Sequence, residues 1–135
     1  MFDTPQKIFF FQGIPGFEDV REYVLTPDRE GVFFHLKGEH RPEASFLLMN
    51  PFLVYPDYAF DLKKTDQDVL ELNCLEDARV FVMVNLQGGL NQATVNLLGP
   101  VVINDRNLRG MQLVLEDSPY TTRHPIIPNL QEKED

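Results

Sequence analysis

The sequence predicts an all-β, mostly antiparallel protein, built as a small β-sandwich or barrel-like domain with one short helix. Short runs rich in β-branched and aromatic residues alternate with glycine and proline turn signals along the 135 residues, which gives about nine candidate strands. Only one segment carries helical signals. Because no internal repeat or linker is found, we expect a single domain over residues 1–128 and a charged, disordered tail over residues 129–135.

The first half of the chain consists of candidate strands separated by turn residues. Gly13, Pro15 and Gly16 mark a turn after the first strand. Asn50 and Pro51 end the fourth strand, where asparagine is expected to satisfy the backbone groups of a turn. We expect residues 52–55 to remain extended, because the flanking prolines disfavour a helix. The strands expected in this half are residues 7–11, 22–25, 32–36, 45–49 and 58–62.

The second half begins with the helix, which we expect over residues 65–72. Thr65 can cap this helix, and acidic residues in its first turn suit the positive end of the helix dipole. Asn96 and Asn104 are expected to be structural, because their side chains can pair with backbone groups around Pro100, which has no N–H to contribute to a ladder. The strands expected in this half are residues 80–86, 92–98, 101–104 and 111–115.

Charge and cysteine content narrow the functional classes. The net charge of −9 argues against direct nucleic-acid binding, because an acidic protein repels phosphate; it favours a basic partner, or serves solubility alone. The single cysteine, Cys74, excludes an intrachain disulfide and is expected to be a buried thiol between apolar neighbours. With no apolar run of about 18 residues and no signal-peptide pattern, we expect a cytoplasmic protein without membrane contact.

The residues that carry chemistry in enzymes do not cluster in this sequence. The glycine pairs lack the lysine and the strand–helix context of a phosphate-binding loop. His35, His40 and His124 are scattered, and a lone cysteine forms no metal-binding pair. Neighbouring carboxylates such as Glu76 and Asp77 are interpreted as a solvated acidic face. We therefore expect no catalytic, cofactor-binding or metal-binding residues, and a protein that is not an enzyme.

Several segments, in a fixed order, resemble the FliW family of flagellar assembly factors. No single segment is specific, since the first marks only a turn and the second is a tripeptide, but together they cover roughly residues 13 to 126. The segments are GIPGFE at residues 13–18, NPF at 50–52 and PDY at 56–58, ATVNLLGPVVIN at 93–104, MQLVL at 111–115, Tyr120, and RHP at 123–125.

The resemblance implies a cytoplasmic binding protein without catalytic activity or cofactor. FliW-like proteins bind flagellin, and they bind the RNA-binding translational regulator CsrA and relieve its repression of flagellin synthesis. The partners expected from the resemblance are therefore flagellin and CsrA, which together would couple the level of flagellin to its translation. The acidity of this chain agrees with a basic partner such as CsrA.

Two surfaces are candidates for these contacts. An apolar groove around Phe52, Tyr55 and Tyr58 is the hypothesis for flagellin, with packing in the core as the alternative, above all for Phe52. An acidic segment between Lys64 and Arg79 is the hypothesis for the CsrA contact, with a solvated face as the alternative. On a helix, Asp68 and Glu71 would share a face, because they are three residues apart. The acidic residues are Asp66, Asp68, Glu71, Glu76 and Asp77.

A different class of function also stays open. Eleven Phe and four Tyr could line a pocket in a small β-barrel that binds an apolar ligand or acts as an enzyme. In a chain of this size, such aromatic residues are more often part of the core. A ligand that co-purifies with the protein would distinguish the two interpretations.

Overall fold

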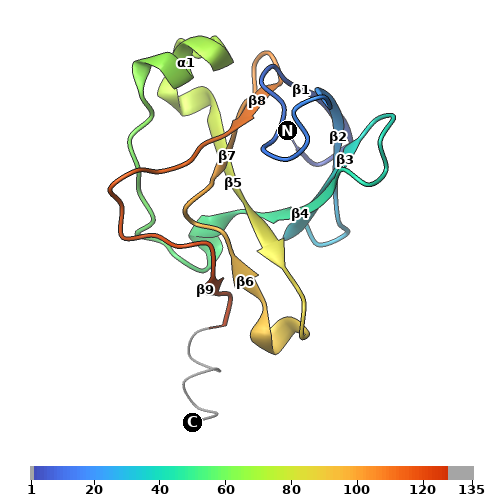
Figure 1. Cartoon of the computed structure of the whole chain (residues 1–135), viewed down its shortest axis with the longest axis vertical. Coiled ribbons are helices and arrows are strands. Elements are labelled where there is room, and N and C mark those ends of the chain that lie inside the picture. The colour runs from blue at the N-terminus through green and yellow to red at the C-terminus, as the bar shows by residue number, and fades with distance from the viewer. Residues whose placement is uncertain (1, 128–135) are drawn as a thin grey trace.

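Seven strands form a closed barrel in the computed structural model, which describes residues 2–127 (Figure 1). Around the barrel the strands follow the order β4-β3-β2-β1-β8-β7-β5, and β5 pairs with β4 to close the ring. All neighbours are antiparallel except β1 and β8, which are parallel. This confirms the predicted fold class. The strands are β1 (Gln6–Phe10), β2 (Glu22–Pro27), β3 (Phe33–Gly38), β4 (Ser45–Met49), β5 (Ala78–Asn85), β7 (Val101–Asn104) and β8 (Arg109–Gln112).

The remaining elements lie outside the barrel. Two short strands, β6 (Thr94–Val95) and β9 (His124–Pro125), extend the sheet from the end of β5. They lie at the opposite end of the molecule from the helix α1 (Lys64–Leu70) (Figure 1). Three 3₁₀ turns complete the described chain: η1 (Pro51–Leu53), η2 (Leu75–Asp77) and η3 (Leu90–Gln92).

The barrel interior is filled by residues that alternate along the strands. Ile8 and Phe10 on β1 are almost completely buried, as are the residues two apart on the neighbouring strands. Gly110 on β8 makes room for them, because a Cβ atom there would lie 2.9 Å from Cζ of Phe10 and 3.1 Å from Cγ2 of Ile8. Phe10 and Ile8 therefore fill the space that a side chain at position 110 would occupy, which keeps the barrel interior closely packed.

Two further apolar clusters lie on the outside of the barrel. One joins β5 to the β6–β9 extension through Val82, Val95 and Leu97. The other packs α1 against β7 and β8 through Leu70, Leu72 and neighbouring strand residues. The helix is short, so this packing rather than intrinsic propensity holds it in place.

Several local predictions are wrong. Residues 58–62 form no strand, and residues 52–55 are not extended, because η1 begins at Pro51; proline suits the first position of a helical turn, where no N–H is needed. The helix starts at Lys64 and receives no side-chain cap from Thr65. Within residues 92–98 only Thr94–Val95 is a strand. The tail predicted over residues 129–135 lies outside the described residues.

The residues predicted to be structural hold turns and tethers. Gly13 and Gly16 have φ angles of 70° and 89°, and a Cβ on Gly13 would approach the backbone of Glu18 to 2.6 Å. The Asn50 side chain accepts a hydrogen bond from the Phe52 N–H at 2.9 Å. Pro15 lies between these two glycines in the sequence of the turn.

Asn96 and Asn104 differ in what they hold. Asn96 accepts from the Gly99 N–H at 2.9 Å and so braces the turn before Pro100, as expected. Asn104 is 3% exposed and does not touch that turn: its Nδ2 donates to the carbonyl of Leu70 at 3.0 Å and to that of Glu71 at 3.2 Å. It therefore ties the end of α1 to the barrel, a role that sequence spacing did not indicate.

Candidate functional site

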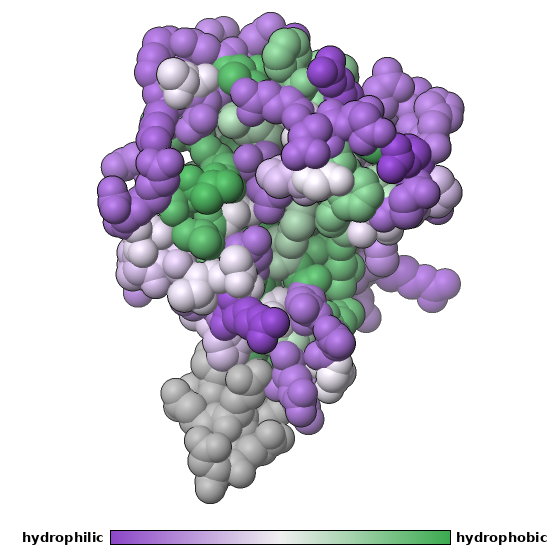
Figure 2. All heavy atoms as spheres, viewed as in Figure 1, coloured by the Kyte–Doolittle hydropathy of each residue, from purple (hydrophilic) through white to green (hydrophobic). Residues whose placement is uncertain are grey.

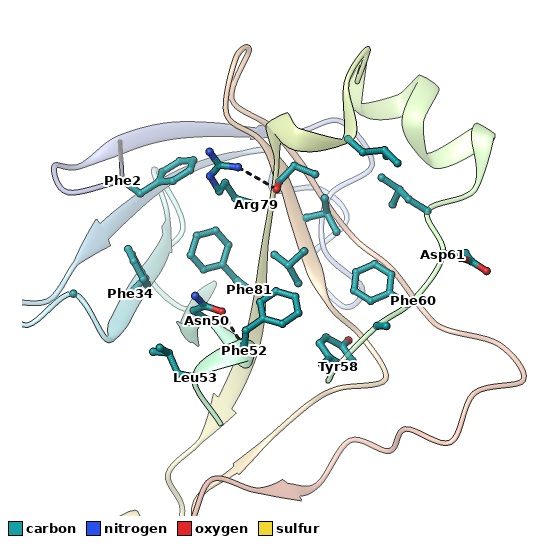
Figure 3. A pocket seen from close by; sticks show the side chains of 17 residues that line it. Phe2, Phe34, Asn50, Phe52, Leu53, Tyr58, Phe60, Asp61, Arg79 and Phe81 are labelled. Carbon is teal, nitrogen blue, oxygen red and sulfur yellow. Dashed lines mark hydrogen bonds between the residues drawn. The ribbon is translucent and has the colours of Figure 1, made fainter. Parts of the chain in front are cut away.

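An apolar groove of about 980 Å³ lies beside the first half of β5. It opens where β4 and β5 diverge, so that residues after β4 form one wall and Ala78–Phe81 form the other. Figure 3 shows the aromatic rings of Phe52, Phe81, Tyr58 and Phe60 gathered around it. The groove also reaches the barrel interior through Phe2 and Phe34, which both contact Phe81 edge to face. We call this surface the β5 groove.

The rim of the β5 groove exposes large apolar side chains. Phe52, Leu53 and Leu75 are 41%, 58% and 63% exposed. Figure 2 shows hydrophobic side chains reaching the surface between hydrophilic ones on the face in view. Clustered apolar exposure around a groove is typical of binding surfaces rather than of isolated surface residues. The geometry is therefore suited to an apolar partner.

Of the three aromatic residues predicted to line a groove, two do so. The rings of Phe52 and Tyr58 have centroids 6.0 Å apart and both face the β5 groove. Tyr58 is nevertheless only 5% exposed, and its hydroxyl donates to the Leu97 carbonyl at 2.6 Å, so it forms the floor of the groove. Burial raises the pKa of the Tyr58 hydroxyl above its usual value.

Tyr55 lies elsewhere, on the side of the β6–β9 extension. Its hydroxyl donates to the Pro125 carbonyl at 2.5 Å, and its ring meets that of His124 at 5.7 Å. Burial raises the pKa of Tyr55 and lowers that of His124. Tyr55 therefore anchors β9 and does not line the groove.

Sequence reasoning missed several groove residues. The sequence predicts a strand over residues 58–62, which include Phe60 and Leu62, and it predicts that Leu75 is one of the apolar neighbours of a buried Cys74. Cys74 is in fact exposed, as are its neighbours Asn73 and Leu75. A useful signal was present in the period-two spacing of Tyr58, Phe60 and Leu62, which does place the three on one side.

The predicted acidic segment is less negative than its sequence suggests. Asp68 pairs with Lys64 at 2.8 Å, and Glu71 pairs with Arg109 at 3.2 Å. Asp77 lies 3.9 Å from Arg106. The arginines come from the β7–β8 hairpin, which is distant in sequence. Within residues 2–127, only Asp66 and Glu76 of the five have no ion pair.

The helix face predicted for the acidic segment is also wrong. α1 ends at Leu70, and Glu71 adopts a left-handed conformation with φ of 52°, so Asp68 and Glu71 do not share a helical face. Both side chains are exposed, as is that of Glu76. The surface formed by α1 and η2 therefore presents mixed charges.

One group of side chains has the spacing of metal ligands. Ligand atoms of Glu22, Glu39 and His40 lie within 4.8 Å of one another. Lys7 Nζ already pairs with Glu39 at 2.9 Å, and this hydrogen bond lowers the pKa of Glu39 and raises that of Lys7. A lysine ammonium occupies the position where a cation would neutralise the carboxylates, so this group is interpreted as a surface ion pair.

Among the described residues, no helix has the length and apolarity needed to cross a bilayer. The longest helix there, α1, has seven residues. This agrees with the absence of a long apolar run in the sequence.

The sequence comparisons with known proteins all identify the same family. The family model described as "FliW protein" matches residues 1–126. A flagellar assembly factor FliW from Moorella thermoacetica is 42% identical, covering 91% of this chain and 80% of the relative. One from Caldicellulosiruptor saccharolyticus is 37% identical, covering 91% and 81%, and one from Bacillus subtilis is 33% identical, covering 90% and 85%.

The structural comparison agrees with the sequence comparison. A crystal structure of the flagellar assembly factor FliW superimposes with a TM-score of 0.84 at 31% identity, covering 89% of this chain and 84% of that one. These relatives are named for flagellar assembly and not for an enzymatic reaction. This agrees with the prediction made from the sequence, in which residues typical of catalytic sites do not cluster. The chain belongs to the FliW family.

Proposed function

We propose that this protein binds flagellin in the cytoplasm and antagonises the translational regulator CsrA, so that the level of flagellin controls flagellin translation. Membership of the FliW family supports this proposal, together with the β5 groove, which offers an apolar binding surface. The groove is the observation that carries the flagellin half of the proposal.

The C-terminal region of flagellin is the proposed occupant of the β5 groove. This region is amphipathic, and its apolar side chains need cover before assembly. Phe52, Leu53 and Leu75 supply exposed apolar area at the rim, while Tyr58 and Phe60 line the inside. Covering such a rim removes apolar surface from water on both partners, which is the dominant favourable contribution to association.

Replacing rim residues by lysine tests this assignment. Leu53→Lys and Leu75→Lys should each weaken flagellin binding about 10- to 100-fold, the equivalent of losing one buried aliphatic side chain. Leu90→Lys is the matched control, because Leu90 is 52% exposed but lies on η3, outside the groove. Calorimetry with purified flagellin and with its C-terminal peptide gives the affinities. Equal affinities for all three variants would exclude the groove.

The surface formed by α1 and η2 is the proposed contact for CsrA. Asp66 and Glu76 are the carboxylates there without an ion pair among the described residues, so we expect them to contribute most to attraction of a basic partner. Exposed charges affect association rate more than final affinity. Asp68, Glu71 and Asp77 are expected to contribute less, since they already pair within the chain.

Charge reversal at the two unpaired carboxylates tests this contact. The double variant Asp66→Lys, Glu76→Lys should slow association with CsrA at low salt and flatten the salt dependence of the rate. Glu30→Lys, an exposed change on the β2–β3 turn, controls for the net charge of the whole chain when it is compared with each of the two single variants, because one carboxylate-to-lysine change alters the charge by the same amount in all three. Release of RNA from a CsrA–RNA complex gives the functional readout. If Glu30→Lys slows association as much, the acidity serves only long-range steering or solubility.

A second candidate function is the binding of a small apolar ligand in the β5 groove. Its volume of about 980 Å³ lies within the range of small-molecule sites. Native mass spectrometry of the purified protein distinguishes the two functions. A bound small molecule that competes with flagellin would favour the ligand, and an unliganded mass with retained flagellin binding would favour the protein partner.

A further inference from the structure

One edge of β5 has no partner strand over its first residues, and this edge borders the β5 groove. β4 pairs with β5 at only two positions, Leu48 with Met83 and Met49 with Val82. Continuing the same register would place Pro51 opposite Val80. Proline has no N–H to donate, and the chain turns away there into η1. The barrel therefore closes over a short distance and leaves the first part of β5 open.

The hydrogen-bonding direction of each β5 residue follows from two observed bonds. The carbonyls of Asp77 and Met83 accept from Asp105 and Asn96, so odd-numbered residues face β7 and the β6 extension. In an antiparallel strand, alternate residues direct both backbone groups to opposite edges. Ala78 and Val80 therefore direct their backbone groups toward the groove.

Half of these groups, the N–H and the carbonyl of Val80, have no partner among residues 2–127. The Ala78 N–H bonds to the Leu75 carbonyl, and the Ala78 carbonyl has one long contact of 3.4 Å with Arg79 Nη1. No hydrogen bond of the described chain engages the N–H or the carbonyl of Val80 on the groove side. Unpaired backbone groups beside an apolar surface are costly and are a template for an added strand.

The charge of the groove further restricts what can bind. Arg79 has an exposed fraction of 42% at the side chain and pairs with Asp105 at 2.7 Å. Asp61, the other charged residue of the lining, points away from the cavity in Figure 3. Because Asp105 already pairs with Arg79, a carboxylate there would gain only a weak additional attraction, from guanidinium N–H donors that this pair does not use, and a basic residue would be weakly repelled.

We propose that an extended peptide segment adds to the open edge of β5 as a strand, with apolar side chains at alternate positions in the groove and an acidic side chain near Arg79. This inference deepens the proposed function, and it rests on that function for the use of the groove as a protein-binding site. A helical region of the same partner can flank the segment, but the part opposite Val80 binds in extended form.

A synthetic peptide tests the added strand directly. The probe is a capped peptide of about eight residues, with valine alternating with threonine and one threonine replaced by glutamate. On binding, hydrogen exchange of the Val80 amide should slow about tenfold at a peptide concentration of about ten times Kd. The Arg79 amide is the internal control, because it faces β7 and is already in the ladder.

Backbone methylation of the probe separates strand addition from simple apolar contact. N-methylation at the residues that face β5 should weaken binding about 3- to 10-fold for each bond lost, whereas methylation at the alternate residues should leave affinity unchanged. Glutamine in place of the glutamate should weaken binding only at low salt. Equal effects in both methylation registers, no binding of the probe, or an unprotected Val80 amide would each overturn the inference.

A parallel titration with flagellin keeps the two proposals separate. Flagellin binding without protection of Val80 would leave the proposed function standing and overturn strand addition. Protection of Val80 by the peptide without any flagellin binding would support strand addition and refute flagellin as the partner. Protection of Val80 by both would support both.

Discussion

Asn104→Ala should destabilise the protein by detaching the end of α1 from the barrel. The Asn104 side chain makes three hydrogen bonds: two donated to the carbonyls of Leu70 and Glu71, and one accepted from the Arg106 N–H at 3.0 Å. The Leu70 carbonyl keeps a second donor, Asn107 Nδ2 at 3.1 Å. Truncation therefore leaves two backbone groups without partners, which costs about 1–3 kcal/mol at about 0.5–1.5 kcal/mol each.

Urea denaturation measures this cost, and hydrogen exchange of the α1 amides locates it. Asn107→Ala is the control, because Asn107 contacts the same Leu70 carbonyl and accepts from the Arg109 N–H, but it is exposed, so water can replace its bonds. The free energy of unfolding should fall clearly more for Asn104→Ala than for Asn107→Ala. Equal losses, or unchanged exchange in α1, would refute the idea that Asn104 is a buried cap for the helix.

Three further changes have defined outcomes. Asn96→Ala should lower the free energy of unfolding by about 0.5–2 kcal/mol through loss of the bond to Gly99; unchanged melting with lost partner binding would instead place Asn96 in an interface. Gly110→Ala should cost about 1–3 kcal/mol in urea denaturation, because the new Cβ overlaps Phe10. The melting temperature should fall as the pH drops below about 6.5, because His124 has a lowered pKa in the fold, so the unfolded chain takes up the proton first; His124→Gln should flatten that dependence.

The sequence predicted the strands best where the signal is local. The strand expected over residues 7–11, before a turn with two glycines, is found as β1 (Gln6–Phe10). Its buried side chains, Ile8 and Phe10, are a finding of the structure. The parallel pairing of β1 with β8 joins residues about a hundred positions apart, such as Phe9 and Arg109. No local pattern carries that register, because the pairing depends on how the whole barrel closes.

Residues 58–62 show that period-two spacing of apolar residues predicts the direction of side chains but does not by itself predict a strand. Tyr58, Phe60 and Leu62 do line one side, the β5 groove, but the segment has no partner strand and is therefore irregular. The spacing predicts which side chains face inward, whereas a strand also needs a neighbour to accept its hydrogen bonds. Local sequence also fails to predict the ion pairs of the acidic segment. The segment has no basic residue within it, yet Arg106 and Arg109 reach it from a distant hairpin.

The β5 groove likewise depends on contacts between residues that are distant in the sequence. Its apolar residues could be recognised by type, but its position depends on the distance over which β4 and β5 pair. Pro51 was correctly expected to end β4; that it also deprives Val80 of a donor follows only once Met49 is known to pair with Val82. A residue that ends one strand thus decides how much of another strand's edge is open. In this barrel the open edge and the exposed apolar rim lie side by side, so a single extended partner could satisfy the backbone of β5 and cover Phe52 and Leu75 together.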